Sequence, residues 1–268
     1  MPVLLSPSHS LTRISLGILI AANLSAQTPA PVASPQAAWT KKTPWGEPDL
    51  SGVWQQRFVD KNGRPVVGLD LAAFTDIPYQ PWSKEKYDYN KTSKGQAYDP
   101  ESACLPAGVP RSTGLPYPFR LLQQPGLIAM LIEGNVHTYR MIFMDGKPHP
   151  EDVNPTWMGH STGKWEGTTL VIDSVGFNDK TWLDPGGHVH TDKLHTIERF
   201  TRTNKQTIDY KIIIDDAGAY TKPYEGGFNL RYSENQELFE YVCQQANYAS
   251  ELMVGDKTKV DRTSQIVP

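Results

Sequence analysis

The sequence lacks the motifs and charge patterns that are typical of several functional classes. Its net charge is only -3 over 268 residues, and no basic patch with interleaved aromatic residues occurs, so we expect no nucleic acid partner. It lacks a phosphate-binding glycine-rich loop and a dinucleotide-binding fingerprint. The segment "GHSTG" at 159–163 looks like the nucleophile elbow of serine hydrolases, but a tight turn and another strand follow it instead of a helix. These absences argue against nucleotide enzymes and serine hydrolases.

Long apolar runs are also missing. The N-terminal run "ISLGILIAANL" at 14–24 is shorter than the roughly 20 apolar residues that span a bilayer. Arg13 precedes it, and the small residues Ser25 and Ala26 follow, which is the order of a secretory signal. We therefore predict a signal peptide over 1–27, a periplasmic or secreted location, and no integral membrane segment after cleavage. The alternative is an uncleaved membrane anchor.

Two further features follow from an exported chain. Residues 28–40 are rich in Pro and Ala and are too poor in apolar surface to fold, so they form a disordered linker. Only two cysteines are present, Cys104 and Cys243, and in an oxidising compartment an isolated pair is most simply a disulfide. Residues 41–268 are predicted to form one domain.

The pattern of that domain predicts an all-β fold. Alternating apolar and polar residues separated by short turn signals recur from Leu127 onward, as in "LHTIERFTR" and "TIDYKIIID". Six or seven such strands must close or pair to cover their edges, which favours a single antiparallel β-barrel. Residues 59–118 are predicted to be a long N-terminal loop region that wraps the barrel and supplies part of a pocket wall.

Three of the seven histidines fall within "GGHVHTDKLHTIERF" at 186–200. His188, His190 and His195 could bind a divalent metal such as zinc or iron, with an open position for water. They could instead serve as acid–base groups without any cofactor, each oriented by a carboxylate such as Asp184 or Glu198. They could also be ordinary hydrogen-bonded loop residues. The sequence leaves these three interpretations open.

Other candidate residues lie outside that segment. His160 sits between two tryptophans in "WMGHSTGKWEG" and could act on a ring-bearing or sugar-like ligand. An inward-facing arginine could hold an anionic group of that ligand. The predicted ring walls and arginines of a small-molecule site are Tyr139, Arg140, Trp157, Trp165, Trp182 and Arg199.

Two resemblances add to these patterns. "DLSGVW" at 49–54 resembles the Gly-x-Trp that opens lipocalin-type (calycin) barrels, where the tryptophan closes one end of the cavity. The motifs "PDLSGVW", "CLPAGVPR", "PTWMGHSTGKWEGTTLVIDS" and "HTDKLHTIERF" are together similar to a family of exported, largely uncharacterised bacterial proteins. The resemblance covers nearly all of the mature chain and implies a single domain. Relatives carry acidic residues and Asn where this chain has Gln244, Gln245 and Ala246.

The leading hypothesis is an exported enzyme that performs His-mediated acid–base chemistry, as a lyase, dehydratase or isomerase, on a partly aromatic or glycosidic ligand inside a barrel. Its acid–base candidates are His160, His188, His190 and His195. One alternative is a metal-dependent hydrolase that uses the last three of these histidines. The other alternative is a periplasmic binding or carrier protein without catalysis.

Overall fold

The computed structural model describes residues 37–56, 58–59, 65–66 and 76–243. The predicted signal peptide (1–27) and most of the predicted linker (28–40) lie outside the described residues. Among the described residues, no helix is both long enough and apolar enough to span a bilayer.

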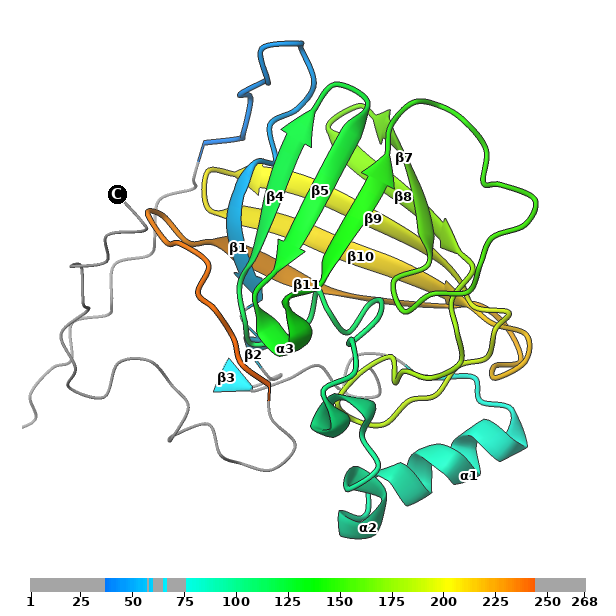
Figure 1. The fold of residues 1–268 in the computed structure, drawn as a ribbon. Helices are drawn as coiled ribbons and strands as arrows, with labels where there is room; N and C mark the ends of the chain where they lie inside the picture. Colours follow the sequence, from blue (N-terminus) through cyan, green and yellow to red (C-terminus); the bar gives the residue numbers. More distant parts are fainter. Residues whose placement is uncertain (1–36, 57, 60–64, 67–75, 244–268) are drawn as a thin grey trace, which may run out of the picture. The chain divides into compact units, whose positions relative to one another are not determined.

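The predicted all-β barrel is confirmed. Its strands close in the order β1-β11-β10-β9-β8-β7-β6-β5-β4, and β4 pairs with β1 (Figure 1). They are β1 (Gly52–Gln56), β4 (Phe119–Gln124), β5 (Leu127–Ile132), β6 (Tyr139–Phe143), β7 (His160–Glu166), β8 (Thr169–Val175), β9 (His195–Asn204), β10 (Thr207–Asp215) and β11 (Tyr224–Tyr232). A separate two-stranded sheet pairs β2 (Phe58–Val59) with β3 (Pro65–Val66).

One strand pair departs from the antiparallel prediction. β6 and β7 run parallel and pair at only two positions, Ile142 with Ser161 and Phe143 with Thr162. A parallel pair needs a crossover connection, and residues 144–159 supply it. The barrel is therefore mixed, and this seam has two paired positions against three on each side of β1.

Period-two alternation builds the core. In β10, Ile208, Tyr210, Ile212 and Ile214 are buried while the residues between them are not, because successive side chains of a strand point to opposite faces. The same alternation brings apolar side chains inward from β4, β5, β8 and β9. A polar layer, described below, interrupts this core.

The tryptophan of "DLSGVW" is fully buried. The Trp54 ring N–H donates to the Leu50 carbonyl, 2.8 Å away. The guanidinium of Arg202 lies over two rings, 3.6 Å from the Trp39 centroid and 4.7 Å from that of Trp54. Such stacking of Arg on aromatic faces is favourable and fixes β1 against β9.

The predicted N-terminal loop region contains helices. They are α1 (Pro81–Asn90), α2 (Ser93–Gln96) and the 3-10 helix η2 (Pro100–Ala103); the single turn α3 (Gly134–His137) lies between β5 and β6. α1 and α2 lie at one end of the barrel (Figure 1). The buried residues of α1 are Ser83, Tyr87 and Asn90. These residues do not form an apolar stripe, so the hydrophobic pattern of the sequence does not predict this helix.

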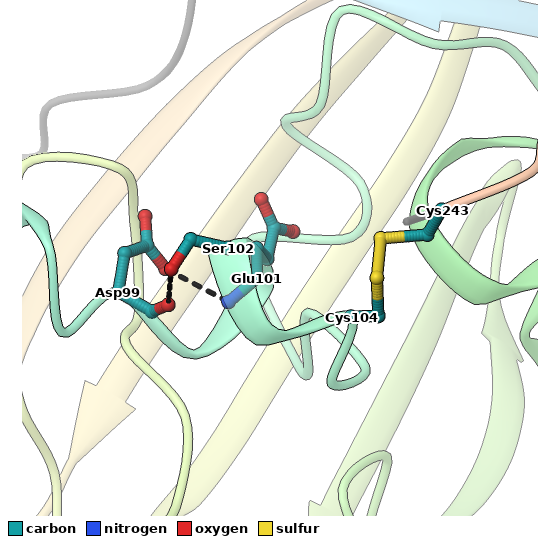
Figure 2. Close-up of a disulfide and its surroundings, with 5 residues drawn as sticks. All are labelled: Asp99, Glu101, Ser102, Cys104 and Cys243. Atoms are coloured by element: carbon teal, nitrogen blue, oxygen red, sulfur yellow. Dashed lines mark hydrogen bonds between the residues drawn. A yellow bond between two sulfur atoms is a disulfide. The ribbon is translucent and has the colours of Figure 1, made fainter. Parts of the chain in front are cut away.

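The predicted disulfide is present. Cys104 directly follows η2 and bonds to Cys243, across 139 positions of the sequence (Figure 2). The Asp99 side chain caps η2 by accepting from the backbone N–H of Glu101. The segment 236–243 forms no strand, so the disulfide rather than sheet pairing fixes its end.

Candidate active site at the β6–β7 seam

A pocket of about 350 Å³ opens where β6 and β7 separate. Its walls come from the first residues of β6 and β7, from the end of the crossover before β7 and from Phe143 at the end of β6. Four residues singled out in the sequence lie in this lining, Tyr139, Arg140, Trp157 and His160, together with Phe143 and Ser161. The pocket therefore combines three aromatic rings with an imidazole, a guanidinium and a hydroxyl.

His160 begins β7, and its ring stacks on Phe143 with centroids 5.2 Å apart. Its Nδ1 lies 2.7 Å from Nδ1 of His149, which belongs to the 144–159 crossover. The Nε2 atom of His149 lies 3.1 Å from Oδ1 of Asp173 on β8. Asp173, His149 and His160 thus form a chain of hydrogen bonds that ends at the pocket.

The direction of these bonds follows from the chemistry of the first member. An ionised carboxylate only accepts, so the Nε2–H of His149 donates to Asp173. A neutral His149 then carries no proton on Nδ1, which accepts from the Nδ1–H of His160. The second nitrogen of a neutral His160, Nε2, is left with a lone pair, and no described residue hydrogen-bonds to it. This is the tautomer that a general base requires.

The charge state of His160 fits that assignment. Burial, together with the neighbouring His149, lowers the pKa of His160 below its ordinary value of 6.5, although Asp145 opposes this shift. The imidazole is therefore mostly neutral at neutral pH. A second imidazole, His195 at the start of β9, also contacts Asp173, with Nε2 2.9 Å from the same oxygen.

Arg140 lies on the inner side of the seam, and its side chain is 1% exposed. Its Nε donates to Ser161 Oγ over 3.0 Å, and its Nη2 donates to Ser174 Oγ over 2.8 Å and to Glu198. The other Glu198 oxygen accepts from the Tyr210 hydroxyl over 3.0 Å. Burial raises the pKa of Tyr210 well above 10, so this hydroxyl stays a donor.

A second carboxylate–imidazole pair lies in the loop between β8 and β9. The fully buried Asp184 accepts from His188 Nδ1 over 2.7 Å, as the sequence predicted for an orienting acid. His188 Nε2 lies 2.6 Å from the Tyr79 hydroxyl, and its ring stacks on Tyr87 with centroids 4.0 Å apart. Asn90 donates to the adjacent carbonyl of Gly187. These contacts tie α1 to the barrel.

The other predicted residues have separate environments. His190 is buried, with Nε2 2.7 Å from Thr181 Oγ1 and Nδ1 3.0 Å from the Thr191 carbonyl, so both nitrogens are satisfied. Arg199 pairs with Glu166 on the outer surface. Trp182 is buried and Trp165 packs half-buried against the core.

The three loop histidines thus make unrelated contacts. No group of three or more His, Cys, Asp or Glu side chains with the geometry to hold a metal ion was found in the described ranges. The metal hypothesis stays a prediction. The structure instead adds His149 and Asp173, which the sequence analysis did not select. His149 lies in a proline-rich segment, and Asp173 is a polar residue in an alternating strand pattern, where an outward-facing residue is expected.

Comparisons with protein-family models, with curated proteins and with solved structures found no match.

Proposed function

We propose that this protein is an enzyme that removes a proton from carbon in a small ring-bearing molecule bound at the β6–β7 seam, with His160 as the general base. The observation that carries the proposal is the Asp173–His149–His160 chain, which leaves the Nε2 lone pair of a pocket-lining imidazole without a partner. A hydrogen bond at one ring nitrogen of an imidazole fixes the tautomer of the ring, and a carboxylate in the same chain of bonds stabilises the imidazolium that forms on proton transfer.

The reaction class follows from where the electrons go. When a C–H bond breaks, the proton forms an N–H bond at His160 Nε2, and its electron pair stays on the substrate carbon. That pair either moves into an adjacent π-system or expels a leaving group from the neighbouring carbon. Reprotonation at another position gives an isomerase, and loss of water or an alkoxide gives a dehydratase or lyase.

The pocket walls support the choice of ligand. Tyr139 is 63% exposed and Phe143 is 39% exposed, although both line the pocket together with Trp157. Exposed rings around a concave site are suited to stacking on an aromatic or sugar ring. The disulfide supports an oxidising compartment, and with the predicted signal peptide it favours the periplasm or the exterior.

Solvent exchange at carbon tests the proposal without knowledge of the product. Aryl ketones, cyclic ketones and phenyl glycosides would each be incubated with the protein in D₂O, and the loss of C–H signals followed by proton NMR. We expect catalysed exchange of at least one compound. Its rate should rise with pH through a His160 pKa below 6.5 and then level off, because only the unprotonated imidazole accepts a proton.

Three variants sharpen the test. His160→Gln should slow exchange by about 10²-fold or more, the usual contribution of a general base. Asp173→Asn should act similarly. An amide N–H that donates to His149 Nε2 would move the His149 proton to Nδ1, and His160 would then accept at Nδ1 and carry its own proton on Nε2. His190→Gln is the matched control, since that histidine is buried outside the pocket, and its rate should stay near wild type.

Other outcomes would decide between the alternatives. Exchange that survives His160→Gln unchanged contradicts the assignment of the base. A protein that binds these compounds but exchanges none of them acts as a carrier. Activity that depends on added divalent metal and is lost in His188→Ala would instead support the metal-dependent hydrolase.

A further inference from the structure

We propose that the ligand of the pocket at the β6–β7 seam (the seam pocket) carries a flexible apolar chain, which lies on the outside of the barrel across β6, β5 and β4. This inference rests on the pocket of the proposed function and adds to its substrate class. The substrate is then a ring with an alkyl or prenyl substituent, rather than a compact polar ring.

The first observation is the composition of the outward side of three neighbouring strands, β4, β5 and β6 (Figure 1). Successive side chains of a strand point to opposite faces, so the buried Leu121, Met130 and Ile142 turn their neighbours outward. Cross-strand pairing arranges the outward residues in three rows, which are Arg120–Leu131–Tyr139, Leu122–Ala129–Met141 and Gln124–Leu127–Phe143. The apolar members of these rows form the outer apolar face.

The second observation is that this face is in contact with water. Leu122 is 45% exposed and Leu131 is 36% exposed, and Tyr139 and Phe143 are exposed as well. The charged residue of the three rows, Arg120, stands at a corner, where its Nη2 donates to the Gln236 carbonyl over 3.5 Å. Contiguous exposed apolar residues beside a concave site are typical of a ligand-binding surface.

The outward sides of the other strands have a different character. Lys164, Asp173 and Arg199 face outward on β7, β8 and β9 and border a different pocket. On β10, Asp209 and Lys211 occupy outward positions. A strand face in water is ordinarily polar, so the apolar rows on β4 to β6 require a separate explanation.

The third observation is that the outer apolar face continues into the seam pocket. Tyr139, Met141 and Phe143 belong to both, because they face outward on β6 and also line the pocket. The ring of His160 stacks on Phe143 with centroids 5.2 Å apart, so the proposed base lies at the border of the face. A ligand whose ring lies beside His160 can therefore extend a substituent across β6 without leaving an apolar surface.

The size of the outer apolar face favours a chain over a protein partner. Three strands about 4.8 Å apart, with five residues at about 3.3 Å each, give a face of roughly 14 Å by 17 Å, or about 240 Å². A stable protein–protein interface buries about 800 Å² on each partner. The face is too small for such a partner, whereas an alkyl chain fits on it.

The inward side of the same strands is already packed. Leu121, Ile128, Met130 and Ile142 are at most 1% exposed and belong to the hydrophobic core. Extra methylene groups inside a well-packed core are destabilising. A chain that starts in the seam pocket therefore lies on the outer side of the wall.

Three phenols with the same ring and chains of different length test the inference by binding alone. They are 4-ethylphenol, 4-butylphenol and 4-hexylphenol, compared by ligand-observed NMR titration. Full burial of one methylene group strengthens binding about fourfold, and burial of one side, as on an open face, about twofold. We therefore expect 4-hexylphenol to bind on the order of tenfold more tightly than 4-ethylphenol.

A double variant, Leu122→Gln with Leu131→Gln, changes the outer apolar face without touching the pocket. Both leucines are exposed and neither lines the seam pocket, so the fold and the affinity for 4-ethylphenol should stay unchanged. The ratio between the hexyl and ethyl compounds should fall to about threefold or less, because a polar surface gains little from covering methylene groups. Ile213→Gln is the matched control, since Ile213 is a partly exposed outward residue of β10 outside the pocket; its ratio should match that of the wild type.

The outcomes separate this inference from the proposed function. A hexyl to ethyl ratio near one, a ratio that persists in the double variant, or binding of none of the three phenols overturns the inference. Binding to phosphatidylcholine vesicles that the double variant abolishes, without any effect of chain length on the phenols, also overturns it and assigns the face to a membrane surface. If the phenols show no dependence on chain length but proton exchange still requires His160, the inference fails and the proposed base stays intact. Binding that depends on chain length and on the two leucines, without proton exchange of any compound, supports the inference and removes the enzyme proposal.

Discussion

The ion pair inside the barrel yields a stability prediction whose magnitude follows from its burial. The Arg140 and Glu198 side chains are 1% and 0% exposed. Replacing either one by Met leaves its partner as a buried charge without a counter-ion, which destabilises a protein by about 3–5 kcal/mol. We therefore expect both Arg140→Met and Glu198→Met to lower the free energy of unfolding by that amount.

The double variant should be more stable than either single variant. Exchange of a buried pair for apolar residues of similar size is often neutral or stabilising. The hydroxyls of Ser161 and Ser174 still bond each other over 2.9 Å. Only the Tyr210 hydroxyl loses its carboxylate acceptor, at a cost of about 1–3 kcal/mol. Adding Tyr210→Phe should recover most of that loss.

Urea unfolding with the disulfide intact, followed by near-UV circular dichroism, measures these differences. An unchanged dependence on urea concentration would show that the denatured state is unaltered. The control is the surface pair Arg199–Glu166, which is 41% exposed on each side at 2.8 Å; its single variants should change stability by at most about 1 kcal/mol. Single variants at the buried pair that behave like the control, or a double variant equal to the sum of its singles, would refute the reasoning.

Two further predictions concern the disulfide and pH. Serine at Cys104 and Cys243 should lower the free energy of unfolding by about 2–5 kcal/mol in urea titrations, because the bond closes a loop across 139 positions of the sequence and restricts the unfolded chain. Burial lowers the pKa of His190 below 6.5, so the unfolded state binds its proton first and stability contributed by the neutral ring is lost as pH falls from 6.5 towards the folded pKa. His190→Gln should flatten that part of the stability-against-pH curve, and an unchanged slope would show that another group causes it.

The barrel itself could be predicted because its strands alternate. "TIDYKIIID" is identical to β10, and "LHTIERFTR" covers most of β9. Each exposes one face and buries the other, which is the pattern that sequence alone reveals. The disulfide could also be predicted, since an exported chain with two cysteines offers only one intramolecular pairing.

The crossover and β7 could not be predicted in the same way. The segment around "GHSTGKWEG" contains three glycines and only one large apolar residue, so it has the composition of a turn. It forms a strand because β8 pairs with it along its whole length, from His160 opposite Val175 to Glu166 opposite Thr169. Tertiary pairing of this kind overrides local propensity.

The histidines show why closeness in sequence is a weak guide to a site. His188, His190 and His195 are within eight positions, yet their partners are Asp184, the Thr181 hydroxyl and Asp173. Strand register, not sequence spacing, decides which side chains meet. The chain of bonds at the pocket joins a crossover residue to two neighbouring strands, and His149 lies 11 positions from His160 and 24 positions from Asp173.

The seam between β6 and β7 places residues with outward and with inward side chains beside one pocket. Neighbouring residues of a strand point to opposite faces, so His160 and Ser161 on β7 lie on different sides of the wall. In a fully paired wall, a ligand inside would reach only the inward set. Here the strands pair at only two positions, and the pocket is lined by outward His160 and by Arg140, whose side chain points inward and is 1% exposed. A ligand in the pocket would therefore meet His160 on the outer face, while the Arg140 guanidinium stays bonded to Ser161, Ser174 and Glu198 inside the barrel.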